Sequence, residues 1–335
     1  MKRVTITEIA RVADVSMKTV SRVLNGEPNV REETRKRVTD AAKTLNYKPN
    51  FSARSLASNR SFVIVHFQDN PNSDYIEKIY RGMNKACRER GYFAVTEKLS
   101  RPYIDGLKDY LTRFEIDGLI LSPPLADDID LLDHLVSINI PFVRISTRVR
   151  PELSSYTGIN DVAAMKRLTE KLISWGHQKM AFITGPQDHE AAVRREKGFL
   201  LALKDAGLPA CDYPIFSGSF STRTAFSVTE DYLKTKPDIT AIIAANDDMA
   251  VGAMMAAMKC GLDVPKDLSI AGFDGSRLGE IIWPHLTTIH QPIEDMSATA
   301  SNILLDEISN PELDQRVVMF DVELLKRGST CSRAD

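Results

Sequence analysis

Beyond about residue 60, the chain alternates short apolar runs with longer amphipathic stretches, and turn residues separate the two. The runs predict strands, and the stretches between them, such as 75–90 and 161–175, predict helices. Strands that alternate with helices form a parallel sheet covered on both faces, so the fold class is α/β. The number of units leaves two lobes or a closed barrel as alternatives. The predicted strands are 62–67, 92–96, 118–122, 141–145, 180–184, 241–245 and 268–273.

The first 47 residues differ, because they contain three short helix patterns and no convincing strand. Thr5 and Glu8 have the spacing of a capping box for the first helix. A tight turn follows at Asp14, a residue type that visits left-handed conformations more readily than most. Ser16 caps the second helix, and the third covers 32–45. The second helix is expected to turn Val20, Val23 and Leu24 inward.

Charge separates these two regions. Residues 1–60 hold 13 basic and 6 acidic side chains, a net charge of +7, whereas the remainder holds 30 basic and 39 acidic ones, a net charge of −9. A small basic head on an acidic body is typical of a protein that meets a polyanion through the head alone. A solvated charged surface with no such partner is the plainer alternative.

Two short helices joined by a tight turn in a basic segment form the helix-turn-helix pattern. Its second helix would lie in the major groove of DNA and read base edges through Met17, Lys18 and Arg22. Short polar side chains beside them suit phosphates, which position a protein without specifying sequence. An ordinary three-helix cap would show the same periodicity. The short polar residues are Ser16, Thr19, Ser21 and Asn25.

The exact residues favour the first interpretation. V-x-x-x-T-V-S-R-V-L-N at 15–25, T-R at 34–35 and L-N-Y-x-P-N at 45–50 resemble the headpiece of the LacI/GalR family of bacterial repressors. The resemblance continues over residues 61–327 through A-N-D-x-M-A at 245–250, G-F-D at 272–274 and L-T-T-I at 286–289. The sequence departs from the family at Asp14, often a glycine, and at Arg31, usually a capping serine; Arg31 could instead reach a phosphate.

The resemblance implies an all-α helix-turn-helix headpiece at 1–47, a hinge at 48–60 and a core at 61–335. The core would be two-lobed and like a type I periplasmic binding protein, with parallel sheets. Its first lobe would cover about 61–160 and 291–320, and its second about 161–290 and 321–330. Residues 50–58 would form a hinge helix that pairs with its copy in a homodimer. A helix of about nine residues is too short to be stable alone in water, so it would fold only on DNA.

In a palindromic operator, Leu56 would then wedge into the minor groove and kink the DNA. The resemblance also implies that the chain is a dimer, because it ends soon after residue 327 without the C-terminal heptads of the family's tetramers. The full set of predicted DNA-binding residues is Thr5, Ser16, Met17, Lys18, Thr19, Ser21, Arg22, Asn25, Arg31, Thr34, Tyr47, Asn50, Ala53 and Leu56.

Between the lobes, at the carboxyl ends of strands, the resemblance implies a pocket for a small effector, expected to be a mono- or disaccharide. Asn246 and Asp274 each follow a predicted strand, where an amide and a carboxylate can bind adjacent sugar hydroxyls. Arg195 matches the family's effector-contacting arginine, and Arg144 beside it would favour an acidic or phosphorylated sugar. Asp247 is interpreted as a helix N-cap, and Trp283 as a packing residue. The predicted effector-binding residues are Asp69, Tyr75, Ser122, Arg144, Arg195, Phe220, Asn246 and Asp274.

Other classes of function lack support in the sequence. The six histidines show no metal-binding spacing, and no nucleophile elbow or phosphate-binding loop is present, so we expect neither an enzyme nor a metal or cofactor. Four scattered cysteines and the absence of a signal-peptide pattern predict a cytoplasmic protein with no membrane span. A solute-binding protein and a pentose-handling enzyme remain rivals. Some family members instead need a corepressor such as a purine.

Overall fold

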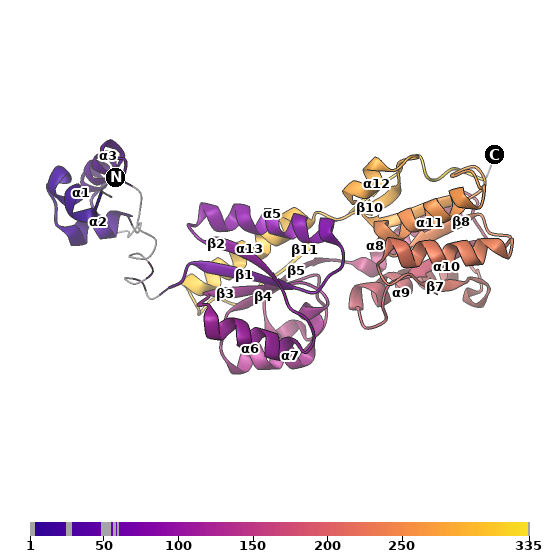
Figure 1. Ribbon diagram of the computed structural model, residues 1–335, viewed down its shortest axis with the longest axis horizontal. Helices are drawn as coiled ribbons and strands as arrows, with labels where there is room; N and C mark the ends of the chain where they lie inside the picture. Colours follow the sequence, from indigo (N-terminus) through magenta and orange to yellow (C-terminus); the bar gives the residue numbers. More distant parts are fainter. Residues whose placement is uncertain (1–3, 25–28, 48–54, 56–57, 59, 334–335) are drawn as a thin grey trace. The chain divides into compact units, whose positions relative to one another are not determined.

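The computed structural model describes residues 4–24, 29–47, 55, 58 and 60–333 (Figure 1). The chain divides into two compact units, residues 1–60 and 61–335. We describe each unit by itself.

The N-terminal unit holds three helices, α1 (Ile6–Ala13), α2 (Met17–Leu24) and α3 (Glu32–Thr44). The backbone N–H of Thr5 donates to Glu8 Oε2 at 2.8 Å, and Asp14 ends α1 in the left-handed region with φ 51°. Ser16 Oγ accepts from the N–H of Thr19 at 3.1 Å at the start of α2. These local signals were readable from the sequence, and the structure confirms each one. The small core consists of Ile9, Ala10, Ala13, Val20, Val23, Val38 and Ala41.

Two details of this unit concern helix ends. Leu24 was expected to turn inward, and that prediction is wrong. It ends α2, and 38% of its surface is exposed, whereas Val20 and Val23 fill the contact with the other helices. Arg31 occupies the N-cap position of α3 and makes no side-chain capping hydrogen bond. The third helix therefore begins without a side-chain cap, as the sequence indicated.

The larger unit contains two six-stranded sheets, which is the two-lobed arrangement rather than a barrel. The first sheet is parallel throughout, in the order β11-β5-β4-β3-β1-β2. The second has the order β12-β10-β9-β8-β6-β7, and its β12 runs antiparallel to β10. The strands are β1 (Val63–Gln68), β2 (Phe93–Lys98), β3 (Gly118–Leu121), β4 (Phe142–Ile145), β5 (Tyr156–Ile159), β6 (Met180–Thr184), β7 (Ile215–Ser217), β8 (Ala241–Ala244), β9 (Ser269–Asp274), β10 (Thr287–His290), β11 (Val317–Phe320) and β12 (Glu323–Leu325).

Helices cover both faces of each sheet, and the strands β3, β4, β5, β6, β8 and β9 are accordingly buried at every position. In Figure 1, α5 (Ser73–Glu89) and α13 (Ile293–Ser309) lie on one face of the first sheet, and α6 (Tyr103–Arg113) and α7 (Ile129–Ser137) on the other. The second sheet is covered by α8 (Asp161–Ser174), α9 (Glu190–Asp205), α10 (Thr222–Lys234) and α11 (Asp247–Lys259), with the short α12 (Arg277–Ile281) beside α11.

The chain passes between the two lobes three times. It crosses from β5 to α8, returns from β10 to α13, and crosses again from β11 to β12. Because of these crossings, each sheet contains strands from both early and late parts of the sequence. Sheet neighbours such as β11 and β5 are therefore far apart along the chain.

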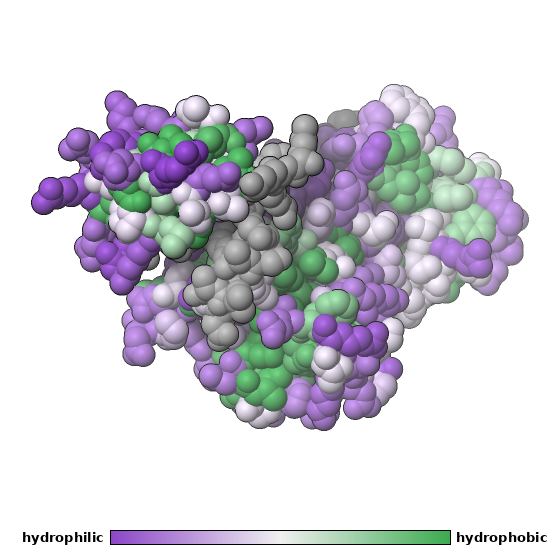
Figure 2. Space-filling model, turned by 60° about the vertical axis from the view of Figure 1, so that its left-hand side comes forward, coloured by the Kyte–Doolittle hydropathy of each residue, from purple (hydrophilic) through white to green (hydrophobic). Residues whose placement is uncertain are grey.

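The described helices include none that is long and apolar enough to cross a membrane. On the face drawn in Figure 2, hydrophilic residues predominate, and apolar ones are interspersed among them.

Candidate functional site

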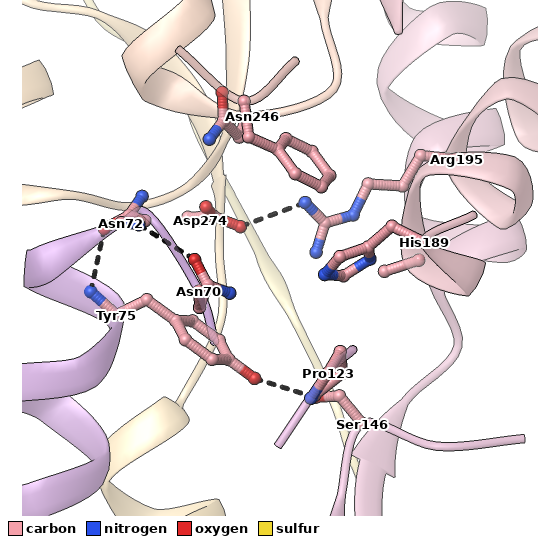
Figure 3. Close-up of a pocket in the computed structure, with 11 residues that line it drawn as sticks. Asn70, Asn72, Tyr75, Pro123, Ser146, His189, Arg195, Asn246 and Asp274 are labelled. Atoms are coloured by element: carbon pink, nitrogen blue, oxygen red, sulfur yellow. Dashed lines mark hydrogen bonds and ion pairs between the residues drawn. The ribbon is translucent and has the colours of Figure 1, made fainter. Parts of the chain in front are cut away.

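The larger unit contains a pocket at the carboxyl ends of strands from both sheets (Figure 3). From the first lobe, the lining residues follow β1, β3 and β4. From the second, they follow β7, β8 and β9 or lie near the start of α9. Such strand ends are where open α/β sheets bind ligands. The lining consists of Asn70, Asn72, Tyr75, Pro123, Ser146, His189, Ala191, Arg195, Phe220, Asn246 and Asp274.

Arg195, on α9, is the buried cation of this pocket. Its Nε donates to Asp161 Oδ1 at 3.0 Å, and its Nη1 donates to the carbonyl of Ala245 at 2.7 Å and to Asp274 Oδ1 at 3.2 Å. The guanidinium carbon also lies 3.9 Å from the centre of the Phe273 ring. Burial alone would lower the pKa of Arg195, but the two carboxylates raise it, so the arginine stays charged.

Asp274 and Asn246 follow adjacent strands, as the sequence indicated. Asp274 ends β9, and its Oδ1 also accepts from Gln291 Nε2 at 2.7 Å. Burial raises the pKa of Asp274, and Arg195 and Gln291 oppose that shift. Asn246 caps α11, because its Oδ1 accepts from the N–H of Met249 at 2.9 Å, and its amide nitrogen remains available to a ligand.

Three pocket residues have backbone angles that side-chain-bearing residues rarely adopt. The φ angles are 61° at Ser146, 52° at Phe220 and 119° at Asp274. Such conformations cost free energy and persist where the surroundings enforce them, typically at functional sites. The ring of Phe220 packs against Gly185 so closely that a side chain at this glycine would overlap it.

The first lobe contributes a chain of capping interactions. Asn70 Oδ1 accepts from the N–H of Asn72 at 2.8 Å, and Asn72 caps α5 by accepting from the N–H of Tyr75 at 2.9 Å. The Tyr75 hydroxyl donates weakly to Ser146 Oγ at 3.4 Å. Burial raises the pKa of Tyr75 to about 12, so the hydroxyl keeps its proton at physiological pH.

Hydrogen bonds and ion pairs also join the lobes around the pocket. Lys78 Nζ, on α5, donates to the carbonyl of Gly275 at 2.8 Å, and Arg194 Nη2, on α9, donates to the carbonyl of Ser146 at 2.9 Å. At the exposed rim, Arg101 pairs with Asp188 at 3.2 Å.

Three residues predicted to bind an effector are not among those lining this pocket. Arg144 is completely buried and donates to Ser154 Oγ and to the carbonyls of Val149 and Arg150, so it holds its own loop together. Because of this, the expected second arginine beside Arg195 is absent from the lining.

The other two are also engaged elsewhere. Asp69 accepts from the Tyr103 hydroxyl at 3.1 Å and pairs with Lys98. Ser122 Oγ is 2.9 Å from His66 Nε2 inside the first lobe.

Two further interpretations need correction. The N-cap of α11 is Asn246 rather than Asp247, which instead is buried and accepts from the N–H of Ser276 and the hydroxyl of Thr288. Burial, with a smaller contribution from Asp274, raises the pKa of Asp247 to about 7. Trp283, expected to pack, is 75% exposed.

Sequence reasoning missed several lining residues, among them His189, Ser146 and Asn72. The signal for Ser146 was its position directly after a predicted strand. His189 gave no comparable signal, because a single histidine before a helix pattern has no characteristic spacing. It was therefore indistinguishable from an ordinary cap.

In the N-terminal unit, α2 presents exposed side chains at its start. Met17 is 52% exposed, and Lys18 and Arg22 are also exposed. Ser16 and Thr19 share a 2.9 Å hydrogen bond between their hydroxyls. Thr5 and Arg31 are exposed, and Thr34, Ser21 and Tyr47 are partly buried. Of the predicted DNA-binding residues, Asn25, Asn50, Ala53 and Leu56 lie outside the described residues.

Within the part of the chain that the structure describes, no group of three or more acidic, histidine or cysteine side chains could hold a metal ion.

Comparison with known proteins finds a matching family or domain for each of the two units. Residues 5–50 match the family of bacterial regulatory proteins called the lacI family, and residues 169–330 match a periplasmic binding protein-like domain. The probable HTH-type transcriptional repressor ExuR of Bacillus subtilis is 32% identical over 97% of this chain and 98% of its own length.

Two solved structures are similar along nearly the whole chain. A complex of the transcriptional regulator CelR with cellobiose has a TM-score of 0.74 and 30% identity, and covers 98% of this chain and 100% of its own. The lac repressor dimer bound to operator and the anti-inducer ONPF has a TM-score of 0.77 and 27% identity, and covers 99% and 100%.

The protein is thus a two-unit regulator with a helix-turn-helix headpiece and a periplasmic-binding-protein-like core. It belongs to the LacI family of bacterial regulatory proteins and is a DNA-binding transcriptional repressor.

Proposed function

We propose that the protein represses transcription as a homodimer on a palindromic operator, and that a small sugar bound between its lobes releases it. The observation that carries this proposal is the match of residues 5–50 to the lacI family, joined in one chain to a pocket of paired polar groups. Operator DNA is intracellular, so the working location is the cytoplasm. The relatives are transcription regulators, and we assign the chain no catalytic step.

We assign DNA binding to residues 1–47, the hinge to 48–60, and effector binding and dimerisation to 61–335. The strand order supports the assignment of 61–160 and 291–320 to the first lobe, because the first sheet holds β1 to β5 together with β11 as its edge strand. The second lobe would then take 161–290 and 321–330, which hold β6 to β10 and β12.

In this proposal, Met17, Lys18 and Arg22 of α2 contact base edges in the major groove. The exposure of Met17 and Lys18 at the start of the helix, and of Arg22 one turn later, supports the assignment, since the first residues of a recognition helix reach the bases. The neighbouring polar residues, and the other predicted DNA contacts, would bind phosphates and set the register.

The hinge gives a separate test. If Leu56 wedges into the minor groove, Leu56→Ala weakens binding to the specific operator far more than binding to random-sequence DNA. Fluorescence anisotropy on both duplexes at one salt concentration measures the two losses. Equal losses on the two duplexes would contradict the wedge.

For the effector, we assign Arg195, Asn246, Asp274, Tyr75 and Phe220 as contacts. Buried side chains that keep an unused donor or acceptor, beside one aromatic ring, suit a ligand with several hydroxyls. The cellobiose complex of CelR supports a saccharide as the effector.

The proposed mechanism is a coupling between the two sites. Sugar binding closes the pocket and changes how the first lobes of the dimer are arranged, so the hinge helices lose their partner and the operator is released. By linkage, operator DNA must weaken sugar binding by the same factor.

The decisive experiment titrates a labelled operator from the gene's own upstream region with the full-length protein. The titration is repeated with sugars, sugar acids and purines. A sugar that weakens operator binding tenfold or more, about 1.4 kcal/mol of coupling, supports the proposal. A compound that tightens binding would instead make the protein a corepressor-dependent regulator. Failure to bind DNA, with tight binding of a solute, would make it a solute-binding protein.

Sedimentation of the full-length protein tests the homodimer separately. A tetramer at operator-binding concentrations would overturn that part of the proposal and leave the effector assignment intact.

A further inference from the structure

His189 is the pocket residue whose hydrogen-bonding capacity the protein leaves unused. Its side chain is 8% exposed, and neither ring nitrogen has a hydrogen-bond partner. It stands at the N-cap position of α9 but makes no capping hydrogen bond, so helix capping does not explain its polarity. In Figure 3 the ring lies beside Arg195 at the pocket wall.

Packing fixes this ring in place. It meets Phe220 edge to face, with centroids 4.9 Å apart, and both residues line the pocket. Buried polar groups in folded proteins nearly always have a partner, so an unpartnered one in a pocket wall points to a ligand that supplies it.

The ring is neutral at physiological pH. Burial first, and then repulsion by Arg195 and Arg194, lower the pKa of His189 to about 4. A neutral imidazole presents one N–H donor and one nitrogen acceptor, which is the pair of functions that a sugar hydroxyl matches.

The arginine beside it is poorly arranged for an anion. Arg195 uses Nε for Asp161 and Nη1 for Asp274 and the carbonyl of Ala245, so each edge of its fork has one nitrogen occupied. A carboxylate or phosphate bound to an arginine usually takes two parallel hydrogen bonds from one such edge. Here only Nη2 is left, which suits a single hydroxyl oxygen.

The surrounding charge also opposes an anion. Asp161 and Asp274, both nearly buried, balance Arg194 and Arg195, and Arg194 is held by Asp161 and the carbonyl of Ser146. The remaining Nη1 of Arg194 has no hydrogen-bond partner, but it lies 3.9 Å from Glu190 Oε2, and Arg194 is not among the residues that line the pocket. A negatively charged ligand would therefore enter a site whose positive charge is already compensated.

We infer that the pocket takes an uncharged sugar and that His189 is a specificity-determining contact to one of its hydroxyls. This inference rests on the proposed function, since it assumes that a sugar is the effector. It excludes sugar acids and sugar phosphates, which a pocket with a free arginine pair would prefer.

The test uses the full-length protein and isothermal titration calorimetry with matched sugars. Each anion is paired with its uncharged parent: D-glucuronate and D-glucose 6-phosphate with D-glucose, D-galacturonate with D-galactose, and D-ribose 5-phosphate with D-ribose. Cellobiose, maltose and sucrose extend the uncharged set. We expect an uncharged sugar to bind at least tenfold more tightly than any charged counterpart.

Two variants test the histidine with the sugar that binds. His189→Phe keeps the ring and removes both nitrogens, and we expect it to weaken sugar binding at least tenfold. His189→Gln keeps a donor and an acceptor, and we expect a loss below threefold. The matched control is His134→Phe, which changes a partly buried histidine of α7 that does not line this pocket. Circular dichroism checks that each variant folds, and if His189→Phe does not, His189→Leu replaces it.

The outcomes separate this inference from the proposed function. A charged sugar that binds more tightly than its parent and releases the operator overturns the inference and keeps the sugar-released repressor. Sugar affinity within twofold of wild type in His189→Phe overturns the role of the histidine. A purine that binds where no sugar does overturns the inference together with the proposed sugar effector.

Discussion

The buried ion network at Arg195 gives the strongest stability prediction. Arg195→Met keeps a side chain of similar length but removes the cation that donates to Asp161, Asp274 and the carbonyl of Ala245. Asp161 then keeps only its contact with Arg194, and Asp274 keeps only the neutral donor Gln291. The side chains of Asp161 and Asp274 are only 2% and 9% exposed, so water cannot replace the lost partner. Removing one member of a buried ion pair costs about 3–5 kcal/mol of unfolding free energy. We expect a loss of that size.

Urea denaturation followed by tryptophan fluorescence measures this loss. Both tryptophans, Trp175 and Trp283, belong to the larger unit, so the fluorescence reports that unit and not the headpiece. The control is Arg113→Met, which removes an exposed ion pair with Asp109 and should cost less than about 1 kcal/mol. A loss in Arg195→Met no larger than the control would refute the reasoning.

The same variant has a predictable pH dependence. Burial already raises the pKa of Asp274, and Arg195 opposes that rise, so removing Arg195 moves the pKa further upward. A carboxyl group whose pKa is higher in the folded than in the unfolded protein destabilises the fold. The destabilisation is complete at pH values above the folded-state pKa and absent at pH values below the unfolded-state pKa. The deficit of Arg195→Met should therefore be largest near neutral pH and shrink as the pH falls. Replacing Asp274 by Asn in the same variant should recover part of the deficit at neutral pH.

Three further substitutions test separate parts of the structure. Gly82→Ala should cost about 1–3 kcal/mol in urea denaturation, because its Cβ would overlap the carbonyl of Glu294 and the hydroxyl of Ser297 where α5 packs on α13. Arg22→Ala should cost about 1–3 kcal/mol of operator binding and relax the preference at one base pair, as anisotropy on single-base operator variants would reveal; a uniform loss on all sequences would place Arg22 on phosphate. Asn246→Asp should keep the α11 cap and the unfolding free energy but weaken sugar binding, whereas Asn246→Ala should also lose about 0.5–2 kcal/mol of stability; equal sugar affinity in Asn246→Asp and wild type would exclude the amide as a contact.

The sequence predicted well most of the strands whose burial is complete. Strands β3, β4, β6 and β8 lie within a residue of their predicted limits, because continuous apolar runs between turn residues leave few alternatives. Strand β5 was missed, since Tyr-Thr-Gly-Ile is short and Gly158 weakens its strand propensity. The edge strands β7, β11 and β12 were missed because they are short and half exposed, so their pattern resembles a loop.

The residues of the candidate site likewise divide into those that the sequence could place and those that it could not. Asn246 and Asp274 could be placed because each directly follows a buried strand, and strand ends of a parallel sheet gather at one edge. Arg144 has the same kind of position, yet its side chain turns into its own loop, where three carbonyls and two hydroxyls accept from it. Position along a strand fixes a residue's height in the sheet, but loop carbonyls that no sequence pattern reveals decide where a long side chain points.

The pocket is also tied directly to the segments that connect the lobes. Asp161, which binds Arg195, begins α8 where the chain first crosses between the lobes, and Gln291, which donates to Asp274, stands at the second crossing. Lys78 adds a bond from α5 to the carbonyl that follows Asp274. A ligand that draws Asp274 or Arg195 toward itself must therefore change the hydrogen bonds of both crossings. Because those crossings join the lobes, occupancy of the pocket has a physical route to the lobe arrangement. Coupling to a distant site requires that this arrangement have two states, which the pocket and the distant site both bias.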